Sequence, residues 1–171
     1  MYVPASFAEN DLAFIREWLA QHPLGLLITG GGDTLQASPL PLLYRDGEDG
    51  AQLVAHMARA NPHAAALRSG ETCLVVFQGE QNYVTPSWYP SKATTHKVVP
   101  TWNYAAVQVR GVVQLRDDMQ WLRVQIAQLT EQMERVRSRP WSVQDAPQAF
   151  IDAQIKAIVG IEIAITDIKG K

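Results

Sequence analysis

Short runs of apolar residues, several of them alternating with polar ones, divide much of the chain into candidate strands. The run from Leu24 to Thr29 follows Pro23 and ends at a triple glycine. Ile161, Ile163 and Ile165 alternate with polar or small residues, which is typical of a strand with one buried face. The pattern predicts strands over 24–29, 34–43, 51–56, 72–77, 104–115 and 159–166, with turns at 30–33, 45–50 and 78–81.

Helical spacing and local capping signals predict helices between these strands. Ser6 and Glu9 have the spacing of a capping box, so a helix is expected to begin near Phe7. Asn61 followed by Pro62 suits the start of a short helix that ends at about residue 69. Further helices are predicted over 118–137, with Asp117 or Asp118 as the cap, and over 148–157.

This order of elements favours a mainly β protein with helices, of the α+β class, rather than a parallel sheet built from strand–helix–strand units. Hairpin links between the strands predict a closed or nearly closed antiparallel barrel flanked by helices. Pro39 and Pro41 place the strand over 34–43 at an edge of the sheet or at a bulge. At 171 residues, the chain is expected to form one domain over 1–171.

Composition narrows the possible environments and partners. The net charge is −2 and no block of Lys or Arg is present, which argues against non-specific nucleic-acid binding by a monomer. No apolar run approaches the roughly 20 residues needed to cross a bilayer, and no signal peptide is predicted. A cytoplasmic protein is the expectation. Cys73 lies in an apolar run and is predicted to be a buried strand residue.

The stretch 83–111 is the most unusual part of the sequence. Its ends resemble strands, and prolines between them predict a long hairpin with an elaborate tip. The tip carries Trp88, Tyr89 and Trp102, followed by Asn103. Two interpretations stay open: a loop folded over the protein's own core, or the wall of a site for a flat aromatic ligand.

The segment from His56 to Asn61 is a second candidate, because it joins a predicted strand to a predicted helix. A helix N-terminus presents free backbone N–H groups to an anion, and Arg59 can add a charge-assisted contact. The alternative is an ordinary helix cap beside a surface arginine. The four histidines show no metal-ligand spacing, and no catalytic acid, base or nucleophile motif is evident.

Several spaced motifs resemble the PaiB family of FMN-binding negative transcriptional regulators. They are Met1-Tyr2-Val3-Pro4, Ala55-His56-Met57-Ala58-Arg59-Ala60-Asn61-Pro62, Val76-Phe77-Gln78-Gly79, Ser87-Trp88-Tyr89 and Val99-Pro100-Thr101-Trp102-Asn103-Tyr104. The resemblance spans essentially the whole chain. It implies the FMN-binding split barrel, with the flavin at a two-fold homodimer interface, and possible binding to DNA. Members usually continue into a further C-terminal segment, whereas this sequence stops at Lys171.

The resemblance also implies which positions contact FMN. The matching positions are His56, Met57, Ala58, Arg59, Asn61, Thr101, Trp102 and Asn103, with Lys97 just before the last run. Related split barrels include haem-degrading proteins, which leaves open His56 or His96 as an axial haem ligand. A small FMN-dependent oxidoreductase and a cofactor-free interaction barrel are the alternatives to the regulator.

Overall fold

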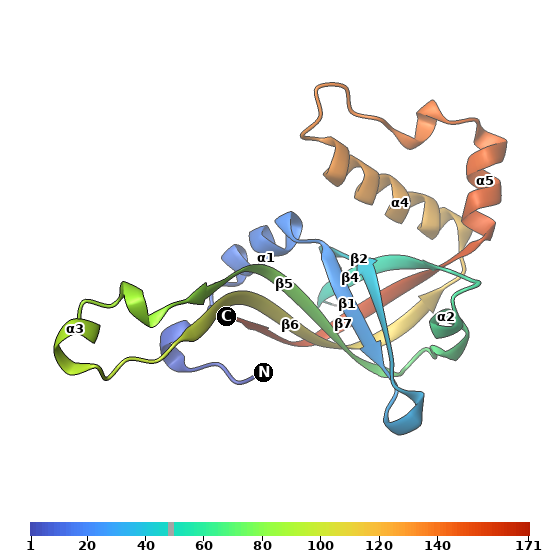
Figure 1. The fold of residues 1–171 in the computed structure, drawn as a ribbon. Coiled ribbons are helices and arrows are strands. Elements are labelled where there is room, and N and C mark those ends of the chain that lie inside the picture. Colours follow the sequence, from blue (N-terminus) through green and yellow to red (C-terminus); the bar gives the residue numbers. More distant parts are fainter. Residues whose placement is uncertain (48–49) are drawn as a thin grey trace.

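In the computed structural model, which describes residues 1–47 and 50–171, one curled antiparallel sheet of seven strands forms the body of the protein (Figure 1). The strand order is β2-β1-β5-β6-β7-β4-β3. The strands are β1 (Leu24–Thr29), β2 (Gln36–Pro41), β3 (Leu43–Gly47), β4 (Gly50–Ala58), β5 (Thr72–Val84), β6 (Thr101–Arg116) and β7 (Ile158–Gly170). This is the split-barrel architecture that the sequence predicted.

The concave face of the sheet encloses the main core. Alternate residues of the central strands point inward, for example Leu53, Ala55 and Met57 of β4 opposite Ile161 and Ile163 of β7. Helix α1 (Leu12–Gln21) contributes further apolar side chains to this core. Burial of this apolar surface is the main force that holds the barrel together.

The opposite face of β4 and β7 is covered by α4 (Met119–Glu134) and α5 (Gln148–Lys156), which form a helical pair on one side of the sheet (Figure 1). Gly160 permits the close approach of α4, because a Cβ at this position would lie 2.4 Å from Cζ3 of Trp121. Short helices α2 (Pro62–Ala66) and α3 (Lys92–Thr95) lie at far ends of the molecule.

The prediction of an edge strand with two prolines is confirmed, since β2 is the first strand of the sheet. Asn61 caps α2 and Asp118 caps α4, also as expected. The capping-box prediction is wrong: α1 begins at Leu12, and Asp11 accepts from the backbone N–H of Ala13 and Phe14. Ala5–Phe7 forms only one turn of 3₁₀ helix.

Two predicted turns are also corrected. The first, over 45–50, overlaps β3, which continues to Gly47, while residues 48–49 lie outside the described residues. The second, over 78–81, is a β-bulge: Gln78 pairs with Ala106, and Gln81 pairs with Tyr104. One extra residue on β5 is accommodated there without ending the strand.

Candidate functional site

A projecting hairpin carries the first group of candidate residues. Strands β5 and β6 extend beyond the barrel as a two-stranded ribbon, and α3 lies in its tip (Figure 1). Tyr83 pairs with Trp102 across the ribbon, and Val84 pairs with Thr101. The predicted hairpin is therefore confirmed, but its aromatic residues do not fold back over the barrel core: Trp88 is 63% exposed and Trp102 is 54% exposed.

A cavity of about 350 Å³ lies near the base of this hairpin. It is lined by Phe7, Thr101, Trp102, Asn103, Tyr104 and Lys171. Its size lies at the lower end of the range of small-molecule pockets, about 300–1,000 Å³. The cavity thus brings together Thr101, Trp102 and Asn103, which the sequence singled out, with three residues that it did not.

Polar contacts fix the aromatic walls of this cavity. The Trp102 indole donates a hydrogen bond from Nε1 to Gln81 Oε1 at 3.0 Å. The Lys171 ammonium donates to the Tyr104 hydroxyl at 2.8 Å and lies 4.1 Å from the centre of the same ring. An aromatic wall beside an ammonium and an amide can hold a flat ring that carries hydrogen-bond acceptors.

The residues that the sequence missed come from distant parts of the chain. Tyr104 follows Trp102 at the strand period of two, so that pattern could have indicated it. Phe7 and Lys171 offer no such signal, because they reach the cavity through a bridge between Glu9 and Gly170. Lys97 is exposed in the hairpin tip and is not among the residues that line this cavity.

The strand-to-helix segment at the end of β4 carries the second group. Asn61 Oδ1 accepts from the backbone N–H of His63 at 2.9 Å, as a helix cap does. Arg59 donates from Nε to the carbonyl of Lys156 at 3.0 Å and forms an ion pair with Asp117. The Arg59 side chain therefore joins the end of β4 to the last residue of α5 and to the segment just before α4, in addition to any role toward a ligand.

The remaining members of this group differ in accessibility. The ring of His56 is half-buried, and its Nδ1 lies 2.7 Å from Oε1 of Gln125 on α4. Met57 is 3% exposed and its side chain belongs to the barrel core, whereas Ala58 is exposed. A ligand contact from Met57 would therefore have to come from its backbone.

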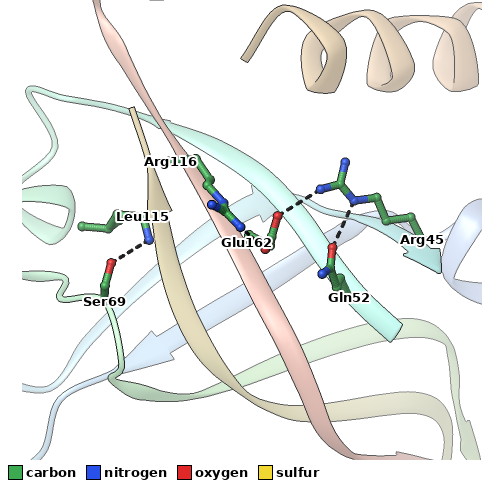
Figure 2. Close-up of polar contacts among 6 residues, drawn as sticks. All are labelled: Arg45, Gln52, Ser69, Leu115, Arg116 and Glu162. Atoms are coloured by element: carbon green, nitrogen blue, oxygen red, sulfur yellow. Dashed lines mark hydrogen bonds and ion pairs between the residues drawn. The ribbon is translucent and has the colours of Figure 1, made fainter. Parts of the chain in front are cut away.

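A cluster of charged residues lies on the same face of the sheet as His56. Figure 2 shows Glu162 between Arg116, at 2.7 Å, and Arg45, at 3.0 Å. Burial raises the pKa of the Glu162 carboxyl, but the hydrogen bond from Arg116 and the charges of both arginines outweigh it, so that this pKa lies below its ordinary value. Nearby, Ser69 Oγ accepts from the backbone N–H of Leu115 at 2.9 Å.

The two candidate groups do not meet within one chain. Thr101, Trp102 and Asn103 lie on the hairpin, whereas the segment from His56 to Asn61 lies toward the opposite end of the sheet, next to α2 (Figure 1).

Among residues 1–47 and 50–171, no group of three or more His, Cys, Asp or Glu side chains could hold a metal ion. None of the helices in this part of the chain is long and apolar enough to cross a membrane.

A curled antiparallel sheet from which one long hairpin projects defines the chain as a split-barrel protein. A family model described as "Putative FMN-binding domain" matches residues 1–167. The chain therefore belongs to this family, whose model assigns FMN as the cofactor of the domain.

Curated relatives match most of this chain, and a solved structure shares its fold. An uncharacterised protein of Emericella nidulans is 36% identical over 100% of this chain and 82% of its own length. The protease synthase and sporulation protein PAI 2 of Bacillus subtilis is 28% identical over 99% of this chain and 79% of its own length. A FAD and haem binding protein of Mycobacterium smegmatis shares the fold, with a TM-score of 0.67, 16% identity and coverage of 96% of this chain and 72% of that chain.

Proposed function

We propose that the protein binds FMN as a homodimer and that the hairpin cavity of one chain forms part of each flavin site. The observation that carries this proposal is the cavity of about 350 Å³ in which Thr101, Trp102 and Asn103 lie together. The indole face of Trp102 suits a flat isoalloxazine ring, and Asn103 and Thr101 offer side-chain groups for its polar edge. When bound, FMN would supply redox chemistry that the side chains cannot.

The phosphate end of the cofactor needs cationic or N–H groups, which the segment from His56 to Asn61 offers. Arg59 already forms an ion pair with Asp117, yet a guanidinium has five N–H donors, and this pair and the Lys156 carbonyl do not use all of them. His56 contributes its remaining ring nitrogen. These residues fit an anionic group, although they lie away from the hairpin cavity of the same chain.

A second copy of the chain would bring the two groups together. The hairpin extends from the barrel and exposes Tyr83, Trp102 and Tyr104 at 46%, 54% and 43%. Large exposed aromatic side chains that lie close together are typical of surfaces that a partner covers. In the proposed dimer, the hairpin of one subunit would reach the His56–Asn61 segment of the other.

Titration with FMN, followed by quenching of flavin fluorescence, tests the cofactor site directly. We expect binding in the micromolar range or tighter and at least a tenfold loss in Trp102→Ala, since a stacked aromatic contributes about 1–3 kcal/mol. Trp141→Ala is the matched control, because Trp141 is also an exposed tryptophan but lines a cavity at the end of α4, away from the hairpin. Equal FMN affinity in both variants and the parent protein would contradict the placement of the ring. A Soret band in the absorption spectrum would instead favour haem, with His56 or His96 as the axial ligand.

We further propose that the FMN-bound dimer acts as a transcriptional regulator of the PaiB type, as the similarity to PAI 2 suggests. The exposed segment that directly follows α4 carries Arg135, Arg137 and Arg139, which two subunits would present twice. Gel-shift titrations at several salt concentrations test this, because phosphate contacts make DNA affinity strongly dependent on salt. Binding that is weak and independent of sequence would refute the regulator.

An FMN-dependent oxidoreductase is the second candidate, and a neighbouring cavity favours it. This cavity of about 480 Å³ shares Phe7 and Lys171 with the hairpin cavity and is also lined by Phe14 and Trp18. It offers room for a second reactant beside a flavin. Steady-state oxidation of NADH or NADPH by the FMN-loaded protein tests this function, and no turnover with a panel of acceptors would eliminate it.

A further inference from the structure

Gln125 is a buried polar residue in the contact between α4 and the sheet. It is fully buried, as is Leu122 one turn earlier on the same helix. Trp121 lies against Gly160, and Gly160 pairs directly with His56 across β7 and β4. The close approach of α4 at Gly160 therefore places the Gln125 amide against the His56 ring, where Oε1 is 2.7 Å from Nδ1.

The hydrogen bonds of this amide distinguish its two possible orientations. With Oε1 toward His56, the Nε2 group of Gln125 is buried and has no hydrogen-bond partner among the described residues. Rotation of the amide by half a turn lets one N–H of Nε2 donate to Nδ1, so that one buried N–H and the carbonyl oxygen, rather than two buried N–H groups, are without a partner. A buried N–H without an acceptor is rarer and costlier than an under-satisfied carbonyl, so the rotated amide is the favoured arrangement.

The orientation of the amide decides where the proton of His56 resides. A neutral imidazole carries one proton, and if Nδ1 accepts from Gln125 that proton must be on Nε2. Gln125 is the only side chain within hydrogen-bond distance of the His56 ring in the part of the chain that the structure describes. The neighbouring carboxylates of Glu162 and Asp117 are paired with arginines.

We propose that Gln125 is a positioning residue that holds neutral His56 in its Nε2–H tautomer, so that His56 donates a hydrogen bond to an anionic oxygen. The identity of that oxygen as the FMN phosphate rests on the proposed function. The assignment of the tautomer does not, because it follows from contacts within the chain. A histidine that donates while neutral can hold a phosphate above the pH range in which imidazole is charged.

The tautomer can be measured in the cofactor-free protein. Long-range ¹H–¹⁵N correlation spectra of ¹⁵N-labelled protein at pH 8 distinguish protonated from unprotonated ring nitrogens, and loss of one set of signals in His56→Gln assigns His56. We expect Nε2 to be protonated and Nδ1 unprotonated. In Gln125→Glu the carboxylate can only accept, so Nδ1 should become protonated. Gln128→Glu, on the exposed side of α4, should leave the spectrum of His56 unchanged. A parent protein with the proton on Nδ1 would overturn the proposal, even if no variant folds.

The ratio of FMN to riboflavin affinity tests the ligand, because riboflavin lacks the phosphate. If His56 donates to the phosphate, Gln125→Glu and His56→Gln should lower FMN affinity by about 10- to 100-fold and leave riboflavin affinity nearly unchanged. Equal losses for both ligands, or no loss, would overturn the role toward the phosphate. A parent protein that binds neither ligand would refute the proposed function and the phosphate role together, while the spectra would still decide the tautomer.

Discussion

The charged cluster around Glu162 provides the sharpest stability test. Glu162 is 8% exposed, and its carboxylate accepts from Arg116 and Arg45, which come from the neighbouring strand β6 and from β3 (Figure 2). Glu162→Gln keeps the shape of the side chain but removes the charge. Both arginines would then remain on a partly buried surface without their counter-charge.

The expected magnitude follows from the exposure of the three side chains. Loss of one partner from a fully buried pair costs about 3–5 kcal/mol, whereas an exposed pair contributes about 0–1 kcal/mol. The arginine side chains are 28% and 41% exposed, so solvent screens part of the interaction. We therefore expect Glu162→Gln to lower the free energy of unfolding by about 2–3 kcal/mol.

Urea unfolding at fixed protein concentration measures this change. The midpoint should fall by about 1 M or more with an unchanged slope. Asp46→Asn is the control, because it removes an ion pair with Arg16 in which both side chains are well exposed, and its midpoint should match that of the parent. A midpoint shift in Glu162→Gln no larger than that of the control would refute the reasoning.

The pH dependence of the same variant supplies an independent check. The pKa of Glu162 is held below its ordinary value by the two arginines despite burial, so its carboxylate stabilises the fold above the ordinary glutamate range. This contribution is lost as the pH falls through the lowered pKa. The stability difference between the parent protein and Glu162→Gln should therefore shrink in acid.

Three further predictions follow from packing and burial. Gly160→Ala should lower the free energy of unfolding by about 1–3 kcal/mol, because the added methyl group meets Trp121. Gly31→Ala, where the space is open, should have little effect, and urea midpoints distinguish the two variants. Burial lowers the pKa of His63, so stability should decline as the pH falls from the ordinary histidine range toward the lowered value, and this part of the pH slope should be absent in His63→Leu. Burial raises the pKa of the Cys73 thiol to about 11, so a disulfide reagent should modify it only at the rate of unfolding; rapid labelling of the native protein would contradict this.

Local chemistry made much of the fold predictable. The Asn61–Pro62 pair marks the start of α2, Asp118 caps α4, and the prolines of β2 indicate an edge strand, because each effect acts within a few residues. The predictions that failed depend on contacts between residues that are far apart in the sequence. Gln78 and Gln81 flank a polar segment with a glycine that is typical of a turn, yet pairing with β6 carries the strand through it as a bulge.

The candidate site was predictable in part for the same reason. Thr101, Trp102 and Asn103 are adjacent in sequence and line one cavity, so a local motif was enough to indicate them. Gln125 lies 69 positions from its partner His56, and only the packing of α4 on the sheet brings the two together. Residues such as these carry no signal in a single sequence, because their role depends on tertiary contacts.

The separation of the two candidate groups has a consequence for the proposed dimer. In the proposed site, neither the hairpin nor the His56–Asn61 segment would hold both ends of a flavin mononucleotide, since the two lie toward opposite ends of the molecule (Figure 1). Subunit association would then complete the site, and FMN would bind the dimer more tightly than the monomer. By linkage, FMN must strengthen the dimer by the same free energy. The exposed aromatic residues of the hairpin would thus serve assembly and cofactor binding at once, which explains why the chain keeps them on a ribbon that extends away from its own core.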